Sequence, residues 1–213
     1  MPSQDGAGES GARGAWSSTP APVMKVDGRV LLCSLADLPQ DLAASVPSPS
    51  GTTEETAFII VDKSDAPPDD DADDTALGES GDSSSSSRVL RAHLLHPGKR
   101  GQHVFLHDVL PRAASFASTH LSFGRSICVA GGGDVGVGVV LVLLQLFFDD
   151  AGRPRRSAPG DAAVAASKNS VRTRLEWVIA SRPQTNPSRA ILKRVNDFLL
   201  SPRSRGGEVG GWS

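Results

Sequence analysis

One stretch of the chain combines a thiol, a run of glycines and a carboxylate at spacings suited to binding an anion. The apolar segment Ser126 to Ala130 leads through glycines to an apolar segment from Val135 to about Phe148. A buried strand, a glycine-rich loop and a helix in this order aim free backbone N–H groups and the positive end of a helix dipole at one point. We therefore predict an anion pocket, with Cys128 at its edge. The candidate phosphate-loop residues are Cys128, Gly131, Gly132, Gly133 and Asp134.

Two nucleotide-binding loops are compared first with this stretch. Gly131, Gly133 and Gly136 satisfy the dinucleotide pattern G-x-G-x-x-G. That pattern belongs on the first strand of its fold, whereas this one comes late in the chain. A P-loop needs Lys-Ser or Lys-Thr after its glycines, and neither pair follows here. The sequence therefore disfavours both loops.

The third comparison is the cysteine phosphatase loop, in which a thiolate precedes an arginine with five residues between them. That arginine grips phosphate, and the helix N-terminus stabilises the thiolate. Here Asp134 stands at the arginine position and Ile127 stands where phosphatases carry histidine. An acid would repel a phosphate dianion, so we expect no phosphatase activity. We expect Cys128 to be a small buried residue at a strand end and Asp134 to cap the following helix.

Apolar patterns along the chain alternate between strand and helix. Strands are predicted from about Arg29 to Leu35, at 58–62, at 88–95 and at 126–130. Helices are predicted at 108–121, with a proline in the first turn, at 135–148, at 167–181, and from an Asn186 N-cap to about Leu200. This order predicts an α/β fold with a mainly parallel sheet flanked by helices and covered on both faces.

Composition divides the chain into one domain and several unpacked segments. The hydrophobic share is 38% of 213 residues, which is below the usual proportion. We predict a disordered N-terminus at 1–23, a domain at 24–201 and a disordered tail at 202–213. Within the domain we predict a disordered acidic insert at 63–87, rich in Asp and Ser, and a mobile loop at 149–166.

The net charge of −2 hides a strong asymmetry between two parts of the chain. Residues 54–82 hold eleven acids and one base, whereas residues 153–205 hold twelve bases and three acids. The basic part predicts a polyanionic partner, although such charges are often only solvated. Two cysteines indicate a reducing compartment, which we take to be the cytoplasm. We expect no membrane span, and the histidine spacings suggest no metal site.

Two motifs in the second half occur together in a known order. The first is Cys-x5-Asp-x-x-Val-Gly-Val, followed by a helix that ends in Leu-Phe-Phe-Asp. The second joins Val-Arg-Thr-Arg-Leu-Glu-Trp-Val-Ile, from Val171, to Pro-x-x-Asn-Pro-Ser-Arg-x-x-Leu-x-x-Val-Asn-Asp-Phe-Leu, from Pro183. Together they resemble the C-terminal domain of the initiator tRNA phosphoribosyl transferase family, which is similar in fold to dual-specificity phosphatases. The resemblance covers about Arg29 to Leu200.

The resemblance implies an enzyme that transfers ribosyl phosphate from 5-phosphoribosyl-1-pyrophosphate to a 2'-hydroxyl of initiator tRNA, which excludes that tRNA from elongation. It also implies a larger N-terminal domain with most of the catalytic groups, and we expect that domain as a partner. By itself this domain would bind tRNA or serve as architecture, and hold no cofactor. The family's loop carries Lys and Ser where this chain has Gly133 and Gly136, which weakens its hold on phosphate.

Basic and polar side chains on the last two predicted helices are the candidates for binding initiator tRNA. Such side chains suit an A-form RNA backbone, which proteins recognise by shape and phosphate, and we expect no DNA partner. The alternative for each is a solvated helix face. The candidates are Lys168, Arg172, Arg174, Asn186, Ser188, Arg189, Lys193 and Arg194.

Two other functions stay open at this point. One is a cysteine-dependent phosphatase that uses Cys128. The other is a catalytically inactive phosphatase-like interaction module, in which the acidic insert at 63–87 meets a basic protein.

Overall fold

The computed structural model describes residues 20–38, 55–62, 88–94, 98–155 and 166–200. The predictions for residues 1–19, for the acidic insert at 63–87 and for the tail at 202–213 fall outside these ranges. They therefore stay predictions.

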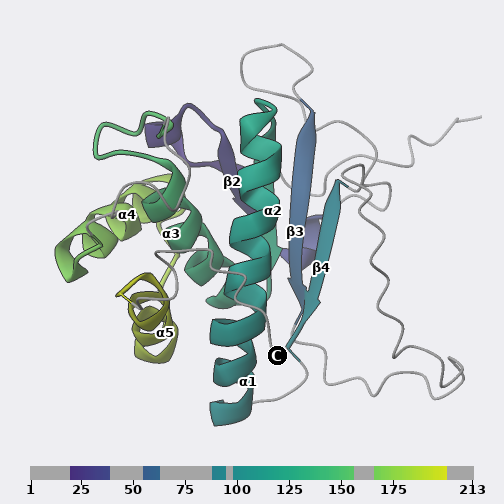
Figure 1. Cartoon of the computed structure of the whole chain (residues 1–213), viewed down its shortest axis with the longest axis vertical. Helices are drawn as coiled ribbons and strands as arrows, with labels where there is room; N and C mark the ends of the chain where they lie inside the picture. Colours follow the sequence, from purple (N-terminus) through teal and green to yellow (C-terminus); the bar gives the residue numbers. More distant parts are fainter. Residues whose placement is uncertain (1–19, 39–54, 63–87, 95–97, 156–165, 201–213) are drawn as a thin grey trace, which may run out of the picture.

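A five-stranded sheet with the order β1-β2-β5-β3-β4 forms the centre of the domain (Figure 1). Its strands are β1 (Ala21–Pro22), β2 (Val30–Cys33), β3 (Thr56–Asp62), β4 (Val89–His93) and β5 (Ser126–Gly131). Strands β2 to β5 are parallel and β1 is antiparallel to β2. The predicted α/β class is confirmed. The prediction of disorder up to residue 23 was wrong for its last residues, because β1 pairs with β2 and Val23 is buried.

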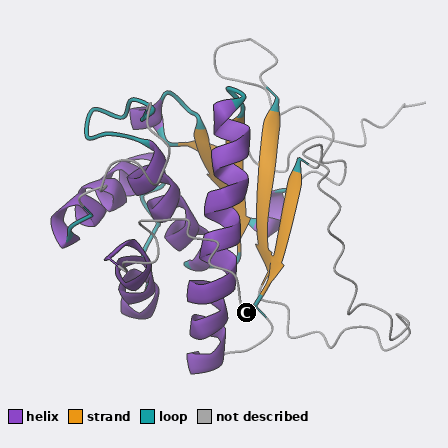
Figure 2. Ribbon diagram, viewed as in Figure 1, coloured by secondary structure: helices purple, strands orange, loops and turns teal. Residues whose placement is uncertain are grey.

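Both faces of the central strands are buried, but the described α-helices pack against only one of them (Figure 2). Alternate side chains such as Leu32, Ile59 and Val129 join the helices in the larger apolar cluster. The opposite face holds a smaller cluster with the 3-10 turn η2 (Leu35–Asp37) beside it. That cluster consists of Leu31, Cys33, Phe58, Ile60, Cys128 and Ala130. The expectation of a two-sided apolar sheet holds, while the described α-helices cover a single side.

The helix predicted at 108–121 is the last part of a longer one. Helix α1 (Gly98–Val104), the π-helical turn η3 (Phe105–Val109) and helix α2 (Leu110–Ser122) follow without a break. Pro111 has no N–H to donate one turn back, and its ring would crowd that carbonyl. The wider π turn, in which the Leu110 N–H donates to the Phe105 carbonyl, accommodates the proline. The proline therefore lies in the first turn of α2, as predicted, and also within the longer continuous helix.

Helices α3 (Val135–Phe147), α4 (Lys168–Ser181) and α5 (Arg189–Leu200) complete the helical layer. Helix α4 begins with a capping box between Ser167 and Ser170. Helix α5 starts later than predicted, because the Ser188 hydroxyl and not Asn186 accepts from the Ile191 N–H at 3.3 Å. Gly138 lets α3 approach its neighbours closely, since a Cβ there would lie 2.7 Å from Ile191 Cγ2.

Candidate anion-binding site

The strand, the glycine turn and the helix lie where the sequence predicted them. Strand β5 ends at Gly131, and α3 begins at Val135 directly beyond Asp134. A Cβ on Gly131 would lie 2.7 Å from the Gly136 nitrogen, so the strand end and the first turn of α3 are in close backbone contact. Gly133 has a φ of +64°, which favours glycine. These glycines allow the turn to be short and bring it up against the N-terminus of α3.

Cys128 does not lie at the edge of the pocket, which corrects its placement among the phosphate-loop candidates. It lies within β5, and its buried side chain joins the cluster on the side away from the helices. Its Sγ lies 3.6 Å from the Sγ of Cys33 on strand β2. The hydrogen bond with Cys33 and burial raise the pKa of Cys128 well above the usual thiol value. A buried thiol of raised pKa is a poor nucleophile.

Cys33 shows the opposite direction of pKa shift. The hydrogen bond with Cys128 lowers its pKa, burial and Asp37 oppose that change, and Arg182 adds to it. The two directions fit a Cys128 thiol that donates to Cys33. Cys33 is itself buried.

Asp134 occupies the N-cap position of helix α3, as the sequence predicted, but its side chain makes no capping hydrogen bond. Its Oδ2 accepts from the backbone N–H of Ser188 at 3.1 Å, 54 residues further along the chain. Asp134 therefore ties the glycine turn to the connection between α4 and α5.

That connection and the glycine turn enclose a cavity of about 290 Å³ at the carboxyl ends of β2 and β5. Ligands in open α/β sheets commonly bind at this position. Asn186 is the one tRNA candidate that lines the cavity, and sequence analysis missed Arg182 and Thr185. The lining residues are Leu32, Ser34, Gly131, Gly133, Asp134, Val137, Arg182, Gln184, Thr185 and Asn186.

Arg182 and Thr185 bring unsatisfied polar groups to this cavity. Among the described residues, no hydrogen bond or ion pair reaches the half-buried Arg182 guanidinium. The Thr185 hydroxyl oxygen is buried and has no hydrogen-bond partner in the described part of the chain. Buried polar atoms usually find partners, so this oxygen, beside a half-buried guanidinium without a described partner, indicates that a polar group belongs in the cavity.

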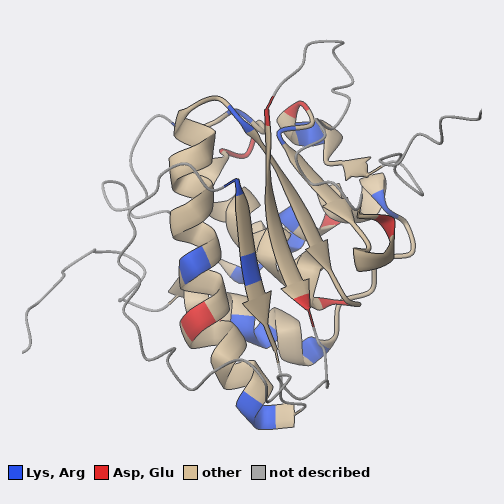
Figure 3. Ribbon diagram, turned by 90° about the vertical axis from the view of Figure 1, so that its right-hand side faces the viewer, with Lys and Arg blue, Asp and Glu red and all other residues tan. Residues whose placement is uncertain are grey.

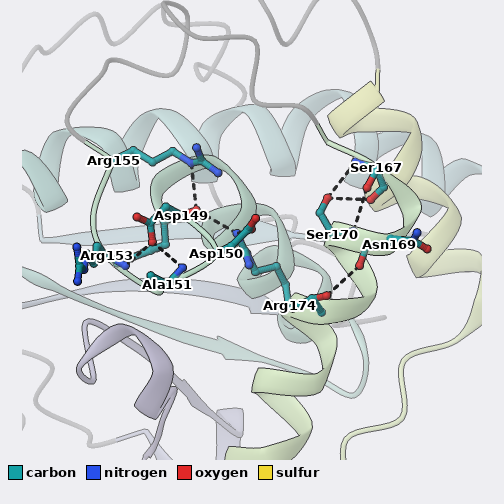
Figure 4. A network of polar contacts seen from close by, with 11 residues as sticks. Asp149, Asp150, Ala151, Arg153, Arg155, Ser167, Asn169, Ser170 and Arg174 are labelled. Carbon is teal, nitrogen blue, oxygen red and sulfur yellow. Dashed lines mark hydrogen bonds and ion pairs between the residues drawn. The ribbon is translucent and has the colours of Figure 1, made fainter.

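Arg174 was predicted to bind tRNA, but it is 0% exposed and belongs to the interior. Its Nη2 donates to the Phe148 carbonyl at 3.3 Å and to Asp150 at 2.8 Å; Figure 4 shows Arg174 beside Asp150. Its guanidinium lies 4.1 Å from the Trp177 ring centroid. Val171, Arg174 and Val178 follow one another at helical spacing on the buried side of α4. The position of Arg174 in this stripe therefore indicated burial, although its charge favoured exposure.

The turn after α3 was predicted to be a mobile loop, yet its first part is tightly bonded. The Asp149 carboxylate accepts hydrogen bonds from the backbone N–H groups of Ala151 and Arg153. Phe148 and Pro154 form an isolated antiparallel β-bridge. Arg155 donates to the Phe148 carbonyl at 3.0 Å, as Figure 4 shows. Residues 156–165 of the predicted loop lie outside the described part of the chain.

The other tRNA candidates lie mostly on the surface. Lys168, Arg172 and Arg189 are exposed, as is Lys193, and Arg172 is 3.7 Å from Glu176. Arg194 is half-buried and bonded to Asp197 and to Gln102. Ser188 is exposed and caps α5. These positions leave four exposed cations on or beside α4 and α5.

The described part of the chain holds neither a cluster of metal ligands nor a membrane-spanning helix. No group of His, Cys, Asp or Glu side chains there could hold a metal ion. None of the helices in the described part of the chain is long and apolar enough to cross a membrane.

A mainly parallel sheet whose strand β5 ends in a glycine turn against a helix N-terminus places this domain in the α/β class. A family model described as the Rit1 DUSP-like domain, for initiator tRNA, matches residues 90–199. The chain belongs to that family, and the family is one of initiator tRNA modification. The match includes both ends of α3 and the connection that lines the cavity.

Comparisons with individual proteins add little. Among the solved structures, a leucine rich repeat and phosphatase domain containing protein from Entamoeba histolytica is 11% identical, with a TM-score of 0.48. The alignment covers 85% of this chain and 91% of that chain. A likeness of this size supports no functional comparison. No curated protein matches the chain.

Proposed function

We propose that this domain binds initiator tRNA for an enzyme that transfers ribosyl phosphate from 5-phosphoribosyl-1-pyrophosphate to a 2'-hydroxyl of that tRNA. The family supports a part in initiator tRNA modification. The tRNA, the donor and the cytoplasmic location follow from the family resemblance. The distribution of charge on the helices is what carries the binding role.

Three helices begin with cations, against the preference of the helix dipole. Helix α1 has Lys99 and Arg100 in its first turn, α4 begins at Lys168 and α5 begins at Arg189, and none has an acid there. The blue first turn of α1 stands at the lower end of the long helix in Figure 3. Cations at a helix N-terminus cost stability, commonly a few tenths of a kcal/mol. Their recurrence favours a role in holding phosphate, because side chain and dipole attract an anion together.

Helix α5 offers the clearest pair of contacts. Arg189 and Lys193 are exposed and four residues apart, so they lie on one side of the helix. The opposite side packs into the core through Ile191, Val195 and Leu199. The described residues give Arg189 and Lys193 no ion-pair partner. Such a pair suits neighbouring phosphates of an A-form backbone.

The phosphatase alternative has less support. Cys128 is buried on the side of the sheet away from the cavity, its pKa is raised, and Asp134 replaces the loop arginine. The interaction module rests on the acidic insert, which is outside the described residues.

The test is binding of initiator tRNA across a series of salt concentrations. We expect Arg189→Gln with Lys193→Gln to weaken binding and to reduce the slope of log affinity against log salt by about 1.5 to 2, one unit or slightly less for each lost phosphate contact. The matched control is Arg91→Gln with Arg112→Gln, which removes the same charge from β4 and α2. Equal effects of both double variants would contradict a specific role for α5. An elongator tRNA measured alongside reports on specificity.

A further inference from the structure

The cavity beside the glycine turn has the features of a phosphate site whose cation comes from another element. In cysteine phosphatases the loop supplies its own arginine, and this loop has Asp134 at that position. Arg182, from the connection after α4, lines the same cavity without a partner among the described residues. An arginine from another element therefore lines the cavity beside the loop.

The groups around the cavity suit a bound phosphate. Arg182 supplies charge, the unsatisfied Thr185 hydroxyl supplies a hydrogen bond, and the first turn of α3 directs N–H groups to the same end of the sheet. Asp134 opposes an anion. Its carboxylate is engaged by the Ser188 N–H at 3.1 Å, which lessens the opposition.

The size and lining of the cavity indicate more than a free phosphate ion. About 290 Å³ is near the lower end of the range for small-molecule sites. Ser34, Gln184 and Asn186 add polar side chains that can bond hydroxyl groups. We propose that this cavity binds the phosphate of a pentose phosphate monoester, held by Arg182 and Thr185, with the sugar hydroxyls toward Ser34, Gln184 and Asn186. This deepens the proposed function, because a ribosyl phosphate is the group transferred, but it does not depend on tRNA binding.

Calorimetric titration of the chain with ribose 5-phosphate, inorganic phosphate and ribose tests the proposal. We expect ribose 5-phosphate to bind more tightly than phosphate, and ribose to show no binding. Arg182→Met should weaken binding of ribose 5-phosphate by about tenfold or more, and Thr185→Val by about threefold to tenfold, as expected for lost charged and neutral hydrogen bonds. Asp134→Asn should strengthen it.

Arg172→Met is the matched control, since it removes an exposed arginine of α4 that does not line the cavity. Thermal unfolding of each variant shows whether it folds. Equal losses in Arg182→Met and Arg172→Met would overturn the site. Equal affinity for phosphate and ribose 5-phosphate would overturn the pentose ligand. Retained tRNA binding in Arg182→Met would separate failure of this site from failure of the tRNA role.

Discussion

The two ends of helix α3 carry the same residue types in opposite states. At the N-terminal end, Asp134 and Arg182 border a cavity, and Arg182 has no partner among the described residues. At the C-terminal end, Asp150 and Arg174 form an ion pair of 2.8 Å, and Arg174 also donates to the Phe148 carbonyl. We call the C-terminal end, where Arg174 is paired, the closed end. The N-terminal end, where Arg182 borders the cavity, is the open end.

The difference separates structural from chemical uses of one side chain. An arginine near the last carbonyls of a helix complements the negative end of the dipole, and Arg174 and Arg155 both bond Phe148 there. An arginine near the first N–H groups adds positive charge to positive charge. The helix dipole does not stabilise the charge of Arg182, whereas a bound anion would.

The largest expected effect on stability comes from a substitution at the closed end. Arg174→Ala should lower the free energy of unfolding by about 3 kcal/mol, because it leaves a cavity and removes the bonds to Phe148 and Asp150. Arg182→Ala should change it by less than about 0.5 kcal/mol, since the guanidinium has no hydrogen bond or ion pair to any described residue. Urea denaturation measures both. Similar losses in the two variants would erase the contrast between the ends.

The next effect concerns the glycine turn at the open end. Gly131→Ala should cost about 2 kcal/mol, because its Cβ would meet the Gly136 backbone at 2.7 and 2.8 Å. Gly132→Ala should cost no more than about 0.5 kcal/mol, since its Cβ would meet nothing nearer than Leu35 at 3.8 Å. Urea denaturation of the two variants compares them. A tolerated Gly131→Ala would show that strand and helix can separate.

A substitution of Cys128 tests whether its thiol belongs to the cavity at the open end. Cys128→Ala should cost about 1 kcal/mol by removing a buried sulfur from the far side of the sheet. It should leave ribose 5-phosphate affinity unchanged, because the thiol does not line the cavity. Calorimetry and urea denaturation supply the two measurements. Lost affinity with intact folding would place the thiol in the site after all.

The smallest effect is a pH dependence at the closed end. Hydrogen bonds from the Arg153 and then the Ala151 backbone N–H groups lower the pKa of Asp149. A lowered folded-state pKa stabilises the fold above the unfolded value, and the stability is lost as pH falls through the folded value. Below about pH 4, wild type should therefore lose stability more steeply than Asp149→Asn. Parallel curves from urea denaturation at several pH values would contradict this.

Local patterns predicted much of the fold and part of the site. The sequence around Ser126 to Phe148 predicted strand, turn and helix, because β-branched runs and glycines act locally. The sequence could not predict which face of the sheet Cys128 lies on. Both faces of β5 are buried, so apolar and polar residues do not alternate along the strand. Arg182 could not be found, because its place at the cavity depends on how α4 packs against the sheet.

The π turn at Phe105–Val109 spans five residues between its hydrogen-bonded groups where an α-helical turn spans four, as if one residue were inserted into the helix. An insertion of this kind rotates everything on one side of it by about 100° relative to the other. Gln102 lies in α1, before the turn, and its Oε1 accepts from Nη2 of Arg194 on α5 at 3.1 Å. A relative that lacked one residue here would carry an unbroken helix and present a different side of α1 to α5.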